Sequence, residues 1–169
     1  MLALALPVGL WWTYFTDTGA AEKALAGAED GPRSRLAIRI GFTHVPLLLG
    51  IVITAAGIHA VVAHPGHHSS WGSALALAGG VALYLVGVAT TRLAVPAGPP
   101  WSRLVTATLV LATVPVGSFG TSALHLVAVV AVLTAMLLLD RLRGARTTAP
   151  PTLTEGPRKE TAHGGRQPR

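Results

Sequence analysis

Cysteine is absent from this chain of 169 residues. That absence excludes disulfide bridges, iron–sulfur clusters, cysteine-ligated zinc sites and thiol nucleophiles. Charge is also scarce, because only 12% of the residues are charged, against roughly 25% in typical soluble domains. With 51% hydrophobic residues, a soluble domain would lack the charge to cover its surface, and disorder over most of the chain is equally excluded. The composition, with a mean hydropathy of +0.55, favours a membrane protein.

Sequence motifs of the common enzyme classes are missing as well. The chain contains no Walker loop, no dinucleotide fingerprint, no His-Glu-x-x-His and no Gly-x-Ser-x-Gly. Its apolar runs have no Asp, Glu, Lys or Arg in their middles, whereas proton pumps and charge-coupled carriers usually keep an intramembrane carboxylate. The sequence therefore predicts no enzyme and no cofactor.

Five apolar segments predict an all-α, polytopic membrane protein. These segments are residues 1–15, 40–62, 73–90, 104–119 and 122–139. A spanning helix needs about 20 residues, a length that the second segment meets. The third and fifth reach it with flanking residues, and the fourth reaches it when extended back to Trp101. The first is too short unless more chain precedes it, and its aromatic end, residues 11–15, is typical of a membrane–water interface.

Lysine and arginine occur only in alternate connections between these segments. Residues 16–35, 91–103 and the tail contain them, whereas residues 63–72 and 117–121 contain none. By the positive-inside rule, this alternation predicts a plasma-membrane protein with its N-terminus outside and its C-terminus inside. The net charge of +6 therefore indicates topology and not nucleic-acid binding.

The composition changes near the C-terminus. From Gly144 the chain is rich in Pro, Gly, Thr and charged residues, with almost nothing apolar to bury. This predicts a transmembrane domain at residues 1–142 and a disordered, basic, cytoplasmic tail at residues 143–169.

A polar group at one level of the membrane predicts a substrate-binding site. His44 lies near the cytoplasmic end of the second segment, and Pro46 removes an amide donor and crowds the carbonyl of Phe42. Ionisable groups within a membrane indicate function by default, although a histidine that only bonds a neighbouring helix is the alternative. The hydroxyl of Tyr84, in the third segment, could reach a polar partner such as His44. The Ala76-x-x-x-Gly80 pair beside it predicts close packing of that helix on another.

Histidines gather on the side predicted to be external. The weak candidates for a metal site are His59, His64, His67, His68 and His125. Neutral imidazole is a common ligand of zinc, copper and nickel. The spacing matches no standard structural zinc site, however, and no carboxylate lies near. A pH-responsive surface and no special role are the alternatives.

Three motifs resemble the bacterial low temperature requirement A family. They are residues 10–17, 44–51 and 80–87, which resemble the family's Trp-Trp-x-Tyr-Phe-Asp, its His-Leu-Pro-Leu with Gly-Ile, and its Leu-Tyr-Leu ending in Gly-His. Their order agrees over residues 1–140. The chain departs from the pattern by an inserted Thr16 and by Val88 in place of histidine. It also resembles only the C-terminal half of a family member.

The resemblance implies a helical polytopic membrane protein and little defined chemistry. We expect a transport or permeation protein, or half of one, and the alternative is a non-catalytic membrane scaffold or subunit. The expected partners are the lipid bilayer and either a missing N-terminal half or further copies of the chain.

Overall fold

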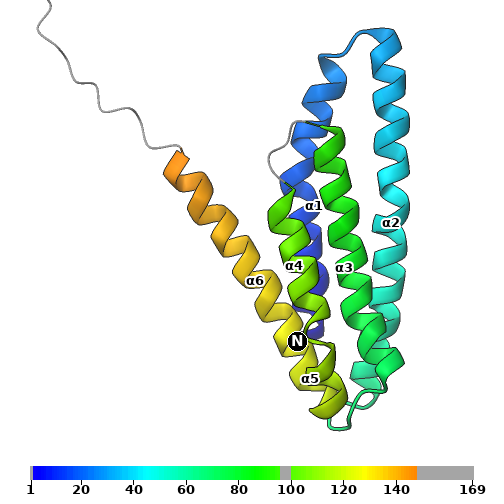
Figure 1. Ribbon diagram of the computed structural model, residues 1–169, viewed down its shortest axis with the longest axis vertical. Helices are drawn as coiled ribbons and strands as arrows, with labels where there is room; N and C mark the ends of the chain where they lie inside the picture. The colour runs from blue at the N-terminus through cyan, green and yellow to red at the C-terminus, as the bar shows by residue number, and fades with distance from the viewer. Residues whose placement is uncertain (1, 96–99, 148–169) are drawn as a thin grey trace, which may run out of the picture.

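The structure, a computed structural model, describes residues 2–95 and 100–147. Within these ranges it contains helices and no strand. The helices are α1 (Leu2–Ala26), α2 (Asp30–Ala63), α3 (Trp71–Ala94), α4 (Trp101–Leu111), α5 (Val114–Phe119) and α6 (Ser122–Thr147). They run alternately up and down in an elongated bundle, except that α5 continues in the direction of α4 (Figure 1). The expectation of an all-α fold is confirmed.

The apolar segments correspond to helices of membrane-spanning character. Four stretches of the described chain are long and apolar enough to cross a membrane, and a shorter apolar helix covers Ala3–Phe15. The four are Gly31–Ala63, Trp71–Ala94, Trp101–Phe119 and Ser122–Arg143. The fourth apolar segment does extend back to Trp101, but it bends between α4 and α5, where Pro115 occupies the first turn of α5. Proline lacks an amide hydrogen and is tolerated in a first turn.

Three helix boundaries differ from the sequence expectation: the end of α1, the beginning of α2 and the end of α6. Residues 16–35 are mostly helical, since only 27–29 separate α1 from α2. The reason is local: the Ala, Glu, Lys and Leu residues of segment 20–26 are strong helix formers, and the chain breaks only at Gly27. Likewise α6 continues to Thr147, past the end of the fifth apolar segment at residue 139. Residues 148–169 of the expected tail lie outside the described residues.

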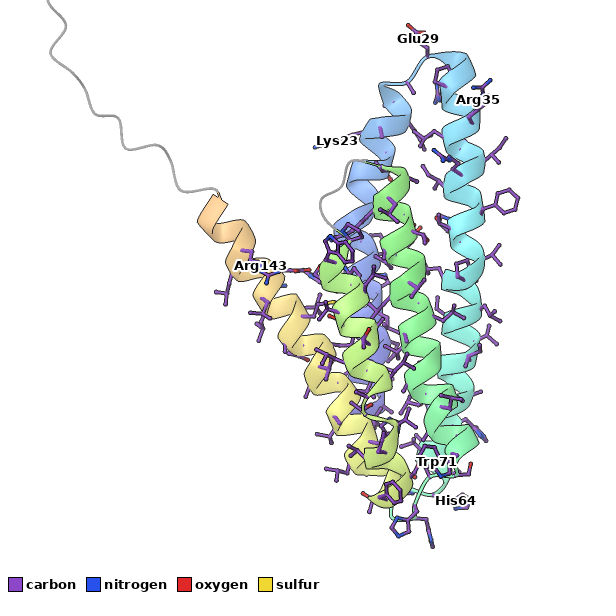
Figure 2. The ribbon with its side chains drawn as sticks, viewed as in Figure 1. Lys23, Glu29, Arg35, His64, Trp71 and Arg143 are labelled. Carbon is purple, nitrogen blue, oxygen red and sulfur yellow. The ribbon has the colours of Figure 1, made fainter. Side chains whose placement is uncertain are left out.

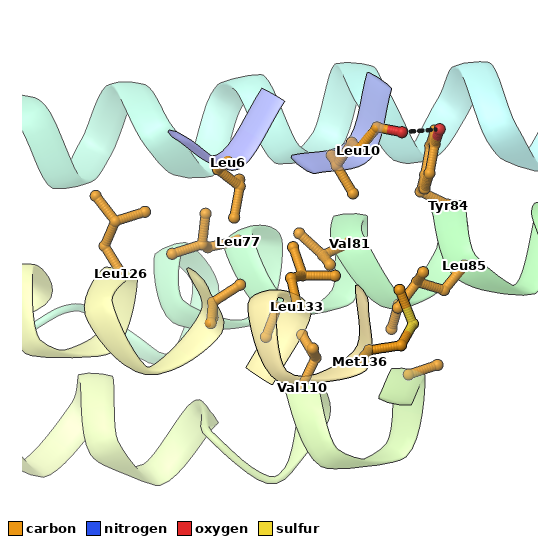
Figure 3. Close-up of a cluster of buried hydrophobic side chains, with 14 of the residues drawn as sticks. Leu6, Leu10, Leu77, Val81, Tyr84, Leu85, Val110, Leu126, Leu133 and Met136 are labelled. Atoms are coloured by element: carbon orange, nitrogen blue, oxygen red, sulfur yellow. Dashed lines mark hydrogen bonds between the residues drawn. The ribbon is translucent and has the colours of Figure 1, made fainter. Parts of the chain in front are cut away.

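Helix α3 occupies the centre of the bundle and contacts the five other helices. Leu77, Val81 and Leu85 of this helix are fully buried. Figure 3 shows them among core side chains from α1, α4 and α6. The position of α3 follows from its composition, because it is apolar around its whole circumference and such helices are buried.

Helices α2 and α3 approach each other closely at glycines. A Cβ atom added to Gly57 would lie 2.5 Å from the backbone nitrogen of Leu77, and one added to Gly80 would lie 2.5 Å from that of Thr54. Gly50 and Gly87 are similarly in close contact with the opposite helix. Small residues permit such an approach in membranes. The expected role of Gly80 in packing therefore agrees with its position.

One end of the bundle is closed by hydrogen bonds between its connections. We call it the histidine end, because His64, His67 and His68 lie there. The amide of Ser69 donates to the carbonyl of Gly117 at 3.0 Å, and that of Ser122 donates to the carbonyl of His67 at 2.9 Å. The hydroxyls of Ser69 and Ser122 also bond, at 2.8 Å. These bonds tie the connection between α2 and α3 to α5 and to the beginning of α6.

The opposite end, here called the basic end, is open. Helices α1 and α2 project beyond the other helices, and α6 leans away from α4 toward its C-terminus (Figure 1). Figure 2 places Lys23, Glu29 and Arg35 at the projecting tip, and His64 and Trp71 at the histidine end. The lysines and arginines whose side chains are described lie toward the basic end: Lys23, Arg33, Arg35, Arg39, Arg92, Arg103, Arg141 and Arg143.

Candidate functional site

A cavity of about 400 Å³ lies between α1, α2 and α3. Its walls are mostly apolar, and the polar side chains among them are those of Tyr14, His44, Thr54 and Tyr84. The lining residues are Pro7, Leu10, Trp11, Tyr14, Phe15, His44, Leu47, Leu48, Ile51, Thr54, Ala55, Ile58 and Tyr84. A concave apolar site with few polar groups is the usual form of a small-ligand site.

His44 and Tyr14 form the polar pair of this cavity. The Nδ1 of His44 lies 2.8 Å from the carbonyl oxygen of Ile40, and a carbonyl only accepts, so Nδ1 carries the hydrogen. In a neutral ring, Nε2 is then the acceptor for the hydroxyl of Tyr14, 3.4 Å away. The two rings meet edge to face, with centroids 6.2 Å apart. In this arrangement the hydroxyl oxygen of Tyr14 can accept a hydrogen bond from a donor group of a ligand.

Tyr84 has a different partner from the one the sequence suggested. Its hydroxyl donates to the carbonyl oxygen of Leu10 at 2.6 Å (Figure 3), and it is Tyr14 that bonds His44. The ring of Tyr84 is 2% exposed and lines the cavity. It therefore positions α1 against α3 and closes one side of the cavity.

Pro46 is not among the residues that line the cavity. It lies inside α2, which runs without interruption through it. The carbonyl of Ile40, six residues before it, accepts both the hydroxyl of Thr43, at 2.7 Å, and the ring of His44. These bonds hold the His44 ring against its own helix, whereas the carbonyl that proline leaves without an amide partner is that of Phe42. Pro46 thus lies at nearly the same height along α2 as His44 but does not line the cavity.

If Ala63 at the end of α2 lies at one boundary of a bilayer, the cavity extends inward from the other boundary. His44 precedes the end of α2, Ala63, by 19 residues, which is about 29 Å at the helical rise. That distance equals the thickness of the hydrocarbon core, about 30 Å. His44 therefore lies at the boundary on the basic side when Ala63 lies at the other. The apolar lining continues from there to Ile58, over about 21 Å.

The candidate metal-binding histidines are not brought together around one point. No group of three or more His, Cys, Asp or Glu within the described chain is placed to hold a metal ion. His64 and His67 do lie close, with ring centroids 6.1 Å apart, and His59 and His68 are exposed. His125 is fully buried.

The environment of His125 is that of a packing residue. Its Nε2 bonds the hydroxyl of Thr113 at 3.1 Å, and that hydroxyl donates to the carbonyl of Val110 at 2.6 Å. Its Nδ1 faces Gly117, where an added Cβ would lie 2.5 Å away. The ring thus occupies the space left by a glycine and connects α6 to the bend between α4 and α5.

Sequence reasoning missed an ion pair between α4 and α6. Arg103, expected in a connection, is 1% exposed within α4, and its Nη1 lies 2.5 Å from Oδ2 of Asp140. The same nitrogen is 3.2 Å from the sulfur of Met136. Asp140 is itself 26% exposed. One feature of the sequence could have indicated this pair. Arg103 precedes the fourth apolar segment and Asp140 follows the fifth, and the alternating topology brings these two segment ends to the same side of the bundle.

A family comparison identifies the chain. The model of the bacterial low temperature requirement A protein (LtrA) matches residues 1–138. The chain belongs to the LtrA family. Together with its apolar helices, this makes it a multi-pass membrane protein of that family.

Comparison with individual proteins adds one relative of this LtrA-family chain. It is 36% identical over 80 residues to an uncharacterized protein of Rhizobium meliloti (strain 1021). The aligned region covers 46% of the chain and 19% of that relative, so the chain spans only a small part of the relative's length. No solved structure matches the chain.

Proposed function

We propose that this LtrA-family chain is a non-enzymatic transport or permeation component that accepts an amphipathic solute in the cavity between α1, α2 and α3. The observation that carries the proposal is the arrangement of that cavity: apolar walls over most of its length and the His44–Tyr14 pair at one end. In this proposal the polar end of the solute bonds the pair, and its apolar part lies along Leu48 and Ile51.

The packing around the cavity supports the same proposal. Helix α1 is held on its other side by Leu6 and Leu10 in the core and by the bond from Tyr84 to the Leu10 carbonyl, and it contacts α2 only slightly. The cavity therefore lies where α1 and α2 are least in contact, so a solute can occupy it without separating the tightly packed α2 and α3. The positive-inside rule predicts that the basic end faces the cytoplasm. In that orientation, the His44–Tyr14 pair would lie near the inner boundary of the plasma membrane.

The decisive experiment fills the cavity. Ala55 lines it, whereas the adjacent Ala56 is exposed on α2 and does not. We expect Ala55→Trp to abolish growth at low temperature in a strain that depends on the gene, and Ala56→Trp to preserve it. Membrane insertion of both variants is measured by immunoblotting of the membrane fraction.

A second pair of variants examines the polar end. We expect His44→Ala to abolish the same growth, because the pair loses its acceptor. His59→Ala is the control, since His59 is exposed on the same helix and lies outside the cavity. If both cavity variants insert normally and support full growth, the transport proposal fails, and a scaffold or subunit becomes the better description.

A further inference from the structure

The cavity between α1, α2 and α3 is open on the side that faces away from the bundle. Its lining residues Trp11 and Phe15, on α1, are 54% and 55% exposed. On α2, the lining residues Leu48 and Ile51 are 60% and 44% exposed. The opposite wall is closed by the buried ring of Tyr84. Because the exposed surfaces are apolar and belong to membrane-spanning helices, a molecule that already lies in the bilayer can enter the cavity from the side.

The side-chain donors around the cavity are already used within the protein. The hydroxyls of Thr54 and Tyr84 donate to backbone carbonyls, at 2.7 and 2.6 Å. The hydroxyl of Tyr14 donates to Nε2 of His44, whose Nδ1 hydrogen bonds another backbone carbonyl. The remaining donor of the lining is the indole of Trp11, and an interfacial tryptophan typically bonds water or headgroups. The polar end therefore offers a ligand acceptor oxygens, since a hydroxyl that donates keeps two lone pairs.

The cavity also lacks charge. No Asp, Glu, Lys or Arg is among the described residues that line it. A carboxylate head group would find no cation there, and an ammonium head group would find no carboxylate. The cost of burying an unpaired ion is larger than the gain from a cation–π contact with a partly exposed ring such as Trp11. The lining therefore favours a neutral head group that donates a hydrogen bond.

We infer that the cavity binds a neutral amphipathic alcohol from the bilayer. The hydroxyl of the alcohol donates to the oxygen of Tyr14, and its hydrocarbon chain lies along Leu48, Ile51 and Ile58. This inference rests on the proposed function, since it names the class of solute that the same cavity accepts. The volume of about 400 Å³ lies within the range of about 300 to 1,000 Å³ that is usual for small-molecule sites.

The test compares four ligands of nearly equal length that differ in the head group: decanol, the methyl ether of nonanol, decylammonium and decanoate. Each is titrated calorimetrically into the purified full chain in detergent. The heat measured with Ala55→Trp, which fills the cavity, is subtracted. We expect decanol to bind at least about fivefold more tightly than the ether, which cannot donate, because one hydrogen bond usually contributes that much. Decylammonium and decanoate should also bind more weakly than decanol.

A matched pair of variants tests the role of Tyr14 as acceptor. His44→Leu removes the nitrogen to which Tyr14 donates, so the hydroxyl becomes able to donate to a ligand. We expect the ether to bind His44→Leu about as tightly as decanol does, because both head groups then find a partner. His59→Leu, at an exposed position of α2 outside the cavity, should keep the native preference for decanol. An unchanged preference in His44→Leu that still binds decanol would overturn the inference.

The native protein gives three further results that would overturn it. They are equal binding of decanol and the ether, binding of decylammonium or decanoate at least as tight as that of decanol, and equal binding to the native chain and to Ala55→Trp. The proposed function survives each of them when Ala55→Trp still abolishes growth at low temperature. Full growth with Ala55→Trp contradicts the proposed function itself, whatever the ranking of the four ligands.

Discussion

The Arg103–Asp140 pair shows how the environment of a residue depends on distant partners. Arg103 is nearly inaccessible to solvent, and its charge is balanced by a carboxylate 37 residues later in the chain. Transfer of a guanidinium from water to a low-dielectric site is costly, and only a paired and hydrogen-bonded arrangement compensates for it. The pair connects α4 and α6 at the level where these helices begin to diverge.

Removal of one partner of this pair should destabilise the bundle. We expect Asp140→Ala to lower the free energy of unfolding in detergent by about 3 kcal/mol, because it removes the carboxylate that pairs with the buried Arg103. The double variant Arg103→Met with Asp140→Leu should recover most of that loss. Leu142→Met, at an exposed position of the same helix, should change stability by less than about 0.5 kcal/mol. Equal stability of Asp140→Ala and the native chain would show that the pair makes no net contribution.

The packing of α2 on α3 rests on glycines spaced by seven residues in each helix. Gly50 and Gly57 of α2, and Gly80 and Gly87 of α3, lie against the opposite helix. A period of seven keeps residues on one face of a helix pair that crosses at a small angle. Gly79 and Gly80 are neighbours in the chain, but only Gly80 faces α2. Membrane helices gain stability from such close contact and not from the hydrophobic effect.

These neighbouring glycines make a matched pair of variants. We expect Gly80→Ala to lower the free energy of unfolding by about 1 to 3 kcal/mol, because its Cβ would overlap the backbone of Thr54. Gly79→Ala should be neutral or mildly stabilising, since its Cβ would meet only Leu75, at 4.0 Å. Thermal unfolding in detergent measures both. If the Gly80→Ala and Gly79→Ala variants were equally stable, α2 and α3 would have to move apart at Gly80 with little loss of free energy.

Aromatic residues mark two levels across the whole molecule. Trp11, Trp12 and Trp101 lie toward the basic end, and Trp71 packs edge to face on Phe119 at the histidine end, with centroids 6.0 Å apart. All five side chains are at least 45% exposed. Trp101 and Phe119 are 18 residues apart, or about 27 Å along the helices. The two levels therefore match the two boundaries of a bilayer core about 30 Å thick.

The orientation predicted from the charge distribution can be tested with two single-cysteine variants, because the native chain has no cysteine. Gly66 at the histidine end and Gly31 at the tip of the basic end are exposed, with nothing within 4 Å of an added Cβ. In intact cells, we expect an impermeant maleimide to label Gly66→Cys and not Gly31→Cys. After permeabilisation both should react. Labelling of Gly31→Cys alone in intact cells would reverse the predicted topology.

Local properties of the chain were enough to predict the helical segments and the gathering of the basic residues toward one end of the bundle. Each of these depends on hydropathy over about 20 residues or on the charge of one connection, and a bilayer imposes the same demands on every such segment. The length of the helical projection at residues 16–35 was missed because polar residues resembled a loop. Their intrinsic helix propensity lies outside what hydropathy measures.

The pairings between helices depend on the packed arrangement and could not be read from the chain. Tyr84 bonds Leu10 and leaves His44 to Tyr14, because the register of α1 against α2 and α3 decides which side chains meet. The metal-candidate histidines diverge for the same reason, since the helical position of His125 directs its ring into the core. Arg103 is buried only because α6 brings Asp140 beside it. Periodicity and composition describe one helix at a time, whereas these contacts depend on the rotation and offset of two or three helices together.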